Sequence, residues 1–517
     1  MIPIRVRFAP SPTGPLHMGG VRTALFNYLF AKKFKGTFIL RIEDTDSQRL
    51  VPGAEKYIID SLKWCGIMPD EGVTYNGEIA TEQSVIHPYA PYRQSQRKAI
   101  YRQYADRLVA QGDAYYAFDT AEFLEVKRKE AEARGQSFLY GPDTRHQLDN
   151  SLCMDAKELA ERLEKEDHWV IRFKIPSDEE VVFRDSIRGE LRVHSRNLDD
   201  KVLWKSADGL PTYHLANVVD DYLMKISHVI RGEEWLPSLP LHILLYRALG
   251  WEETKPRFAH LPLLLKPDGK GKLSKRDGDR LGFPVFPLAW KTPEGETIKG
   301  YREEGYLPEA FVNMLALLGW NPGTEQEIMS LEEMASLFSL NRVVKSGARF
   351  NPEKAHWFNQ QHIREKTCRE LAPMFARYLC QAGVRYNPTM LAPIINLVKE
   401  RATFVRDFVA LTDYFFTAPT QYDPKLMAKY WKEDTPQQME AVREVLSGNR
   451  CLSKQDIERS LAAIVQSNGW SMGDIMNALR LCVVGAAKGP GITDIIFLIG
   501  TEETVKRIDQ ILARTRP

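Results

Sequence analysis

A loop rich in proline and glycine separates a short strand-like segment from a helical segment near the start of the chain. Residues 4–9 (IRVRFA) have the composition of a short buried strand, and residues 10–15 (PSPTGP) must form a loop because proline fixes φ and restrains its predecessor. Apolar residues then recur at helical spacing over 20–33. Residues 36–42 form a second strand-like run that ends in the acidic cluster 43–46. This order predicts half of a doubly wound sheet, whose ligands bind beyond the carboxyl ends of its strands.

The α/β pattern is interrupted once and then gives way to helices. Residues 113–204 combine a Lys/Glu-rich helical stretch with alternating strand-like runs, and apolar strands return at 228–232 and 258–265. A basic loop with nearby glycines, KLSKR, follows at 272–276. Beyond about residue 300 the periodic segments are helical, at 309–318, 330–338, 366–382, 391–416, 425–446, 453–466, 472–486 and 501–515.

These patterns predict a fold class and its domain boundaries. We expect an α/β Rossmann-type catalytic domain that is split by an α+β insertion and followed by an all-α C-terminal region. A chain of 517 residues is too long for one hydrophobic core, which agrees with several domains. The expected parts are the first catalytic half 1–112, the insertion 113–204, the second catalytic half 205–276, a helical domain 277–345 and a further all-helical domain 346–517.

Composition and charge exclude several classes of protein. The content of 44% hydrophobic and 27% charged residues is typical of a soluble globular chain, and apolar runs such as 310–318 are shorter than the roughly 18 residues that span a bilayer. The first residues lack the plan of a signal peptide, and six scattered cysteines predict no disulfide framework, so we expect a cytoplasmic protein. Basic residues outnumber acidic ones in 341–517 although the net charge is only +2. This excess fits a polyanion partner, or chance variation among solvated helix faces.

Two loops carry groups that suit chemistry on phosphates. His17, Gly19 and Gly20 directly precede a predicted helix, whose N-terminus presents free N–H groups to an anion. Lys272 and Lys275 lie on the KLSKR loop. Positive groups on both sides of a split sheet would stabilise the charge that develops during phosphoryl or nucleotidyl transfer. Each loop alone is weak evidence, because such residues are more often ordinary solvated side chains.

The order of the motifs resembles that of a known family. Residues 9–20 (APSPTGPLHMGG) resemble the HIGH motif of class I aminoacyl-tRNA synthetases, and KLSKR resembles their KMSKS motif. The resemblance covers nearly the whole chain and returns at 478–490. Four further runs are similar to glutamyl-tRNA synthetases of the bacterial type: 41–46 (RIEDTD), 91–95 (PYRQS), 211–221 (PTYHLANVVDD) and 230–235 (IRGEEW).

The resemblance implies a two-step reaction and a set of site residues. ATP, with Mg²⁺, would activate L-glutamate to glutamyl-adenylate and release pyrophosphate, and tRNA(Glu) would then accept the glutamate at its 3′ end. The implied catalytic residues are His17, Lys272 and Lys275. The implied ATP-binding residues are Thr13, His17, Gly19, Gly20, Glu234, Trp235, Leu263, Leu264 and Lys275. The implied glutamate-binding residues are Arg7, Ala9, Ser11, Glu43, Tyr213, Asn217 and Arg231, with Arg7 and Arg231 on carboxylate and Glu43 on the α-ammonium.

The resemblance also implies domain roles and a partner list. The insertion would bind the acceptor end of the tRNA, residues 277–345 its stem and residues 346–517 its anticodon, in a monomer without a membrane partner. Many relatives carry a zinc site in the insertion, but the matching residues here are 117–119 (AFD) and 144–146 (TRH). One histidine and one carboxylate do not make a four-ligand thiolate site, so we expect no structural zinc and no other bound metal. Residues 76–89 are expected to form a surface loop.

Three alternatives remain open at this stage. A glutaminyl-tRNA synthetase shares the catalytic plan but carries a β-barrel anticodon module, whereas the periodicity of 340–517 is helical. A tRNA-independent nucleotidyltransferase of the same superfamily would end soon after the second motif. An inactive paralogue that only binds RNA or protein would have no physical reason to keep His17, Lys275, Arg7, Glu43 and Arg231 together. The sequence does not indicate whether tRNA(Gln) is also charged, nor which residues read the anticodon.

Overall fold

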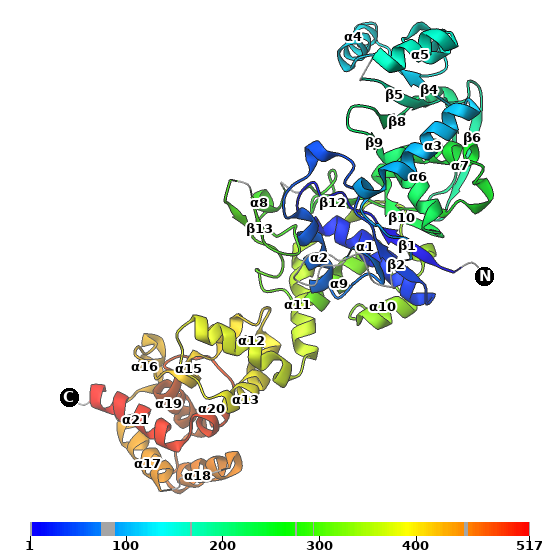
Figure 1. The fold of residues 1–517 in the computed structure, drawn as a ribbon. Coiled ribbons are helices and arrows are strands. Elements are labelled where there is room, and N and C mark those ends of the chain that lie inside the picture. The colour runs from blue at the N-terminus through cyan, green and yellow to red at the C-terminus, as the bar shows by residue number, and fades with distance from the viewer. Residues whose placement is uncertain are drawn as a thin grey trace. The chain divides into compact units, whose positions relative to one another are not determined.

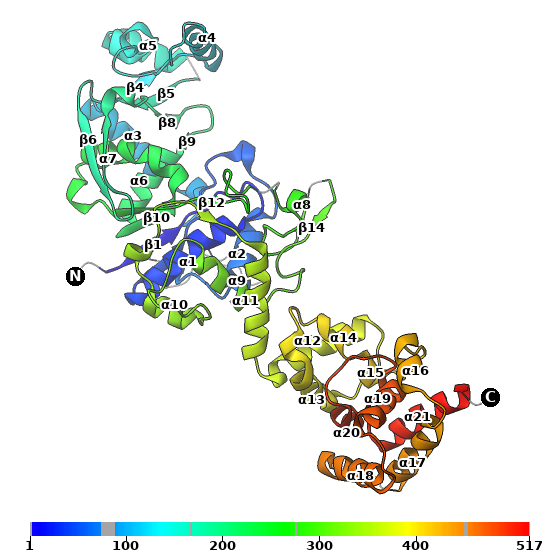
Figure 2. The same ribbon diagram turned by 180° about the vertical axis from the view of Figure 1, so that it is seen from behind.

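The computed structural model describes residues 3–73, 88–165, 168–274, 277–292, 294–448 and 453–515 (Figures 1 and 2). Most of the predicted loop at 76–89 therefore lies outside the described residues. The chain divides into two compact units, Met1–Ala355 and His356–Pro517. Every helix among the described residues is too short or too polar to cross a bilayer.

The first unit begins with the predicted strand, loop, helix and strand. Strand β1 (Arg5–Phe8) pairs in parallel with β2 (Thr37–Leu40), and β2 pairs in parallel with β3 (Glu71–Gly72). Helix α1 (Met18–Lys33) connects β1 to β2 and buries Val21, Leu25 and Leu29 completely. The three- and four-residue spacing of these apolar side chains puts them on one face, so burial of that face fixes the helix against the sheet.

The second half of the catalytic sheet joins the first at β1. Strands β10 (His228–Gly232) and β11 (Arg257–Leu261) are parallel. The backbone N–H of Arg5 donates to Ser227 Oγ at 2.8 Å, and the N–H of Ser227 donates to the Arg5 carbonyl at 2.9 Å. This contact at the start of both strands places β1 beside β10 (Figure 1). The carboxyl ends of the parallel strands therefore lie along one edge.

The inserted segment contributes to two sheets. Its own antiparallel sheet contains β4 (Ala114–Ala117), β5 (Val170–Phe173), β8 (Val202–Lys205) and β9 (Leu210–Pro211), beside helices α4 (Ala121–Glu132) and α5 (Ala156–Lys165) (Figure 2). The hairpin of β6 (Glu180–Asp185) and β7 (Gly189–His194) instead extends the catalytic sheet, because Phe258 of β11 pairs with Asp185. Alternating burial along β6 puts Val181, Phe183 and Asp185 on the covered face. Sequence periodicity predicts these strands but not which sheet they join.

Further helices and short strands surround the catalytic sheet. Helices α9 (Pro308–Leu317) and α10 (Leu331–Leu337) pack against α1. The Phe26 and Phe338 rings lie 5.2 Å apart in an edge-to-face contact. The short strands β12 and β15 are parallel partners, and β13 and β14 form a hairpin. The remaining elements are α2 (Ala54–Trp64), α3 (Lys98–Gln111), α6 (Tyr213–Leu223), α7 (Leu239–Ala248), β12 (Leu264–Leu265), α8 (Asp277–Leu281), β13 (Trp290–Lys291), β14 (Thr297–Ile298), α9 (Pro308–Leu317), α10 (Leu331–Leu337), β15 (Ala348–Arg349) and α11 (Pro352–Glu365).

The second unit is helical throughout its described residues, as predicted for the C-terminal region. Its core includes Arg507, whose Nη1 donates to the carbonyls of Tyr414 and Val483 at 2.6 and 2.9 Å. These bonds satisfy a buried cation that would otherwise oppose folding. The helices are α12 (Cys368–Gln381), α13 (Pro388–Val398), α14 (Asp407–Leu411), α15 (Asp413–Phe416), α16 (Pro424–Tyr430), α17 (Thr435–Ser447), α18 (Lys454–Ser467), α19 (Met472–Val484), α20 (Ile492–Ile499) and α21 (Thr501–Thr515).

Two predicted helices are wrong in their extent. The segment 391–416 is not one helix, because α13 ends at Val398 and α14 begins only at Asp407, whose Oδ2 accepts the N–H groups of Thr403 and Phe404 at 3.0 and 2.8 Å in the turn before it. The segment 425–446 is split into α16 and α17, and Pro436 lies in the first turn of α17. Proline is favoured at a helix start because it lacks the N–H that would be unpaired there anyway.

Candidate active site

The loop after β1 brings His17 to the N-terminus of α1. His17 caps the helix, since its Nδ1 accepts the backbone N–H of Gly19 at 3.1 Å and its carbonyl accepts that of Gly20 at 2.8 Å. A Cβ added to Gly20 would lie 2.5 Å from Leu16 Cδ1, so a larger residue there would displace the Leu16 side chain. Thr13 turns the same loop by donating its N–H to the Ser11 carbonyl at 2.9 Å. The N–H of Met18 also donates, to the Val285 carbonyl at 2.9 Å, so these first N–H groups of α1 have partners within the protein.

The loop that carries the second motif lies beside the first. The N–H of Leu273 donates to the Leu264 carbonyl at 2.8 Å, and a Cβ on Gly19 would lie 3.7 Å from Leu264 Cδ1. Lys272 Nζ forms an exposed ion pair with Glu234 Oε1 at 3.1 Å. The N–H of Leu263 donates to Glu233 Oε1 at 2.8 Å. The structure thus brings together most of the residues predicted around ATP, whereas Lys275 and Arg276 lie outside the described residues.

A network of buried charges lies at the carboxyl ends of β1 and β2. Arg7 donates from Nε and Nη2 to the two oxygens of Asp221 at 3.0 and 3.2 Å. Arg41 joins the network by donating to Asp221 Oδ1 at 2.8 Å and to Glu43 Oε1 at 3.0 Å. Asn217 donates to the same Glu43 oxygen at 3.2 Å. Three of the predicted glutamate-binding residues, Arg7, Glu43 and Asn217, therefore share one hydrogen-bonded network.

The two carboxylates of this network have net pKa shifts of opposite sign. Burial raises the pKa of Asp221, but the guanidinium groups of Arg7 and Arg41 outweigh it, and the net pKa lies below its ordinary value. Burial also raises the pKa of Glu43, and here Arg41 and Arg7 only partly offset it, so the net pKa stays above its ordinary value. Glu43 therefore favours a cationic partner more than Asp221 does, which suits a carboxylate that receives an ammonium group.

Arg231 at the end of β10 has a different environment. Its side chain donates from Nε to His260 Nε2 at 3.0 Å, from Nη1 to the Tyr213 oxygen at 2.8 Å and from Nη2 to the Trp235 carbonyl at 3.3 Å. All three acceptors are uncharged, and within the described residues no carboxylate forms an ion pair with Arg231 although only 5% of it is exposed. A guanidinium has five N–H groups. Two of them, one on each terminal nitrogen, thus remain for a ligand.

Neutral rings surround this guanidinium. The rings of Tyr213 and Trp235 lie 4.3 Å apart, and His242 lies 5.6 Å from Tyr213. Burial raises the pKa of Tyr213 to about 12, and burial lowers the pKa of His214 to about 4 and that of His242 as well. These side chains are therefore uncharged near pH 7, so they neither neutralise Arg231 nor compete with it for an anion.

Three predicted residues remain to be placed: Ala9, Ser11 and Trp235. Ala9 and Ser11 belong to the loop after β1, whose Pro10 carbonyl accepts the N–H of Glu43 at 3.0 Å, but the Ser11 side chain is exposed. Trp235, predicted beside the adenosine, lies against Tyr213 and accepts a hydrogen bond from Arg231. The part of Trp235 in ATP binding stays a prediction.

Sequence reasoning missed four buried residues that hold this site: Arg41, Asp185, Asp221 and His260. Arg41 and Asp221 lie within the runs 41–46 and 211–221 that resemble the family, and that was the available signal. Asp185 and His260 lie outside those runs, so no sequence signal singled them out.

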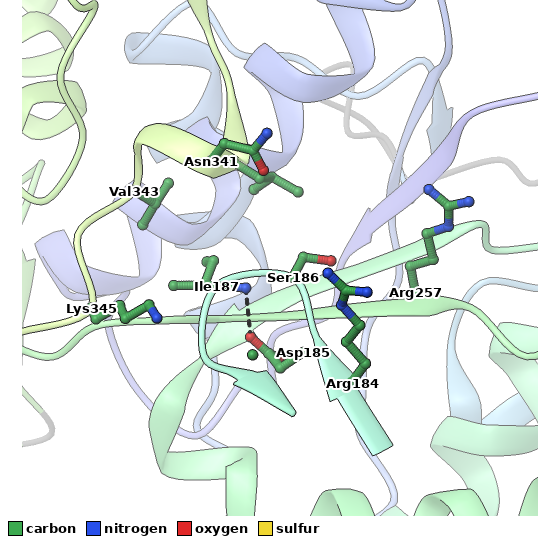
Figure 3. A pocket seen from close by; sticks show the side chains of 10 residues that line it. Arg184, Asp185, Ser186, Ile187, Arg257, Asn341, Val343 and Lys345 are labelled. Carbon is green, nitrogen blue, oxygen red and sulfur yellow. Dashed lines mark hydrogen bonds between the residues drawn. The ribbon is translucent and has the colours of Figure 1, made fainter. Parts of the chain in front are cut away.

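A separate hollow of about 700 Å³ lies at the turn of the β6–β7 hairpin. Arg184, Asp185, Arg257 and Lys345 are among its lining residues (Figure 3). None of the residues predicted to bind ATP or glutamate lines it, although Asp185, which contacts His260 at the candidate active site, does.

Known proteins resemble this chain along nearly its whole length. Residues 3–357 match the family model of tRNA synthetases class I (E and Q), catalytic domain, and residues 368–512 match that of an anticodon binding domain. A glutamate–tRNA ligase of Flavobacterium johnsoniae is 54% identical over 510 residues, which cover 99% of each chain. The chain belongs to the glutamate–tRNA ligase family. The resemblance read from its motifs and the predicted fold class are thereby confirmed.

Further members of the glutamate–tRNA ligase family support the assignment. A glutamate–tRNA ligase of Porphyromonas gingivalis is 54% identical over 506 residues, 98% of this chain and 97% of the relative. A crystal structure of a glutamate tRNA ligase from Elizabethkingia meningosepticum in complex with its amino acid is similar, with a TM-score of 0.91 and 49% identity. That match covers 99% of this chain and 100% of the other.

Proposed function

We propose that the chain activates L-glutamate with ATP to glutamyl-adenylate, releases pyrophosphate, and transfers the glutamate to the 3′ end of tRNA(Glu). One observation carries the choice of glutamate: Arg231 is a buried guanidinium with two N–H groups left for a ligand and no carboxylate partner among the described residues. A buried cation without a counter-ion is costly, and a substrate carboxylate removes that cost.

The surrounding residues complete a recognition site for glutamate. The two N–H groups of Arg231 bind the side-chain carboxylate of the substrate, with Arg7 and Tyr213 beside it. Glu43, held by Arg41 and Asn217, receives the α-ammonium. Ala9 and Ser11 border the same pocket from the loop after β1. Glutamine in this pocket would place an amide N–H group against Arg231, leaving buried donors unpaired, which is how a polar site rejects a near-isosteric analogue.

Positioning and electrostatics carry the chemistry, since no side-chain nucleophile is needed. Class I tRNA synthetases use ATP, and here Thr13 and His17 receive its phosphates at the start of α1. The Gly19-Gly20 backbone lets the nucleotide approach closely, and Glu234, Trp235, Leu263 and Leu264 border the adenosine. Magnesium enters with ATP as part of the substrate complex. His17, Lys272 and Lys275 stabilise negative charge on the phosphates as the glutamate carboxylate attacks the α-phosphorus.

Each part of the chain has its own role, and three of the parts bind the tRNA. Residues 1–112 and 205–276 form the catalytic domain, the insertion 113–204 binds the acceptor end, residues 277–345 contact the stem, and residues 346–517 bind the anticodon. The match of residues 368–512 to an anticodon binding domain and the excess of basic residues in 341–517 support this division. We further propose a monomer that works in the cytoplasm.

The alternative of a glutaminyl-tRNA synthetase shares the catalytic family, whose model covers both specificities. That class carries a β-barrel anticodon module, whereas the described residues from 356 onward are helical. A tRNA-independent nucleotidyltransferase would lack the second unit. Both alternatives are therefore less well supported than a glutamate–tRNA ligase.

We also propose that the insertion folds without zinc. Asp119, at one matching position, accepts the Tyr140 hydroxyl at 2.8 Å and the backbone N–H of Asp149 at 3.1 Å, so its oxygens already have hydrogen-bond partners. Elsewhere in the described ranges, no group of three or more His, Cys, Asp and Glu side chains is placed to hold a metal. We expect elemental analysis of chelator-washed protein to find no zinc, and one zinc per chain would contradict the proposal.

A charging assay tests the proposed function. Purified enzyme with ATP and Mg²⁺ is given glutamate or glutamine together with purified tRNA(Glu) or tRNA(Gln). We expect glutamate to be attached to tRNA(Glu), with glutamine rejected because of Arg231. Attachment of glutamate to both tRNAs would indicate a relaxed anticodon site. Attachment of glutamine, or of neither amino acid, would overturn the proposal.

A further inference from the structure

Behind Arg231 a buried chain of hydrogen bonds leads to the inserted segment. Asp185 Oδ2 lies 2.7 Å from His260 Nδ1, and His260 Nε2 accepts the Nε–H of Arg231 at 3.0 Å. The side chains of Asp185 and His260 are both fully buried. We propose that Asp185 and His260 are positioning residues that orient Arg231 for the side-chain carboxylate of glutamate, so that the inserted hairpin takes part in amino-acid selection. This inference rests on the proposed function.

The direction of each hydrogen bond follows from its partners. The Nε–H of Arg231 can only donate, so His260 Nε2 must be the bare, accepting nitrogen. A neutral ring then carries its hydrogen on Nδ1 and donates it to Asp185. Burial lowers the pKa of His260, with the hydrogen bond to Asp185 only partly opposing it, which agrees with a neutral ring. Asp185 thus selects the tautomer that Arg231 needs.

Backbone N–H groups hold the Asp185 carboxylate in the orientation in which it faces His260. Its Oδ1 accepts the backbone N–H groups of Ile187 and Arg188 at 2.9 and 2.8 Å, and Figure 3 shows the carboxylate turned toward Ile187. Its Oδ2 also accepts the N–H of His260 at 3.1 Å. The hairpin turn and the end of β11 therefore both fix the carboxylate, and His260 cannot swing away without breaking these bonds.

The chain of bonds also decides which edge of Arg231 faces the substrate. His260 occupies Nε, while Tyr213 and the Trp235 carbonyl occupy one N–H on each terminal nitrogen. The two remaining N–H groups lie on different terminal nitrogens and can bind both oxygens of a carboxylate. If His260 donated instead of accepted, two N–H groups would meet and the guanidinium would have to turn.

Asp185→Asn tests this with little change in shape. The asparagine oxygen stays with the two backbone N–H groups of the turn, so its NH₂ faces His260 Nδ1 and forces the wrong tautomer. The backbone N–H of His260 also loses its acceptor, because it donates to the same oxygen in the wild type. We expect the KM for glutamate to rise by about ten- to a hundred-fold, because misplacing a binding group by about 1 Å has effects of that size. The selectivity for glutamate over glutamine should fall, while the KM for ATP stays unchanged.

Two variants of His260 and one control separate positioning from folding. His260→Gln can present an acceptor where Nε2 lay and should keep a KM for glutamate near that of the wild type, whereas His260→Asn reaches only Asp185 and should resemble Asp185→Asn. Asp200→Asn alters an equally buried carboxylate, which binds Tyr115 and Arg145 and has no bond to Arg231. It should lower thermal stability without changing the KM for glutamate.

Failure of the inference and failure of the proposed function look different. A folded Asp185→Asn enzyme with the wild-type KM and selectivity would overturn the positioning role, and so would equal behaviour of His260→Gln and His260→Asn. A wild-type enzyme that does not charge tRNA with glutamate would overturn the proposed function itself.

Discussion

Replacement of Arg231 by glutamine should lower kcat/KM for glutamate by about 10³-fold, because loss of a buried charged pair costs about 2–5 kcal/mol and each 1.4 kcal/mol is tenfold. Glutamine at 231 keeps some hydrogen-bonding capacity but loses the charge and the two N–H groups that face the substrate. Steady-state charging kinetics with varied glutamate would measure the loss. The kcat/KM for glutamine as substrate should fall much less, so the preference for glutamate over glutamine should shrink.

Two further variants make this result specific. Arg231→Lys keeps the charge without the planar fork and should fall between the wild type and Arg231→Gln. Arg257→Gln changes an exposed arginine at the opposite end of the neighbouring strand β11 and should leave charging unchanged. An Arg231→Gln enzyme with unaltered kcat/KM would remove Arg231 from glutamate recognition.

Replacement of Asp221 by asparagine should destabilise the first unit by about 3–5 kcal/mol, because it leaves Arg7 buried without its counter-ion and removes one of the carboxylates that pair with Arg41. The loss should be visible at neutral pH as a lower urea midpoint of unfolding. Asp46→Asn, which alters a half-exposed carboxylate in a long surface ion pair with Arg49, should change stability by less than about 0.5 kcal/mol.

The cost of Asp221→Asn should depend on pH with a definite sign. The pKa of Asp221 is lower in the folded protein than its ordinary value of 3.8, so its contribution to stability is complete above that pH and is lost as the pH falls through the folded value. Below that value the wild-type carboxyl is itself neutral, and the difference in unfolding free energy between wild type and variant should disappear. A gap that stays constant down to the lowest accessible pH would contradict the charge-based account.

The strands and helices at the catalytic edge of the sheet could be predicted from short stretches of sequence. The spacing of Val21, Leu25 and Leu29 predicts α1, and the prolines before it predict the loop that ends at His17. The prediction failed at 391–416, where the apolar period continues through residues 403–407 but the Asp407 side chain binds the backbone N–H groups of Thr403 and Phe404 in a turn between two helices. A side chain that competes for backbone N–H groups is invisible to periodicity.

By itself the sequence determined the α/β class, the split of the sheet, the helical C-terminal region and the two motif loops, because these depend on backbone propensity and on apolar spacing over a few residues. Only the tertiary structure decided that Asp185, His260 and Arg231 form one chain of bonds, although they lie 75 and 29 positions apart. It also decided that Asp221 pairs with both Arg7 and Arg41, whereas no carboxylate in the described part of the chain pairs with Arg231. Which buried charges meet depends on how distant strands pair, and hydrophobic burial, which drives folding, is non-directional and carries no such information along the sequence.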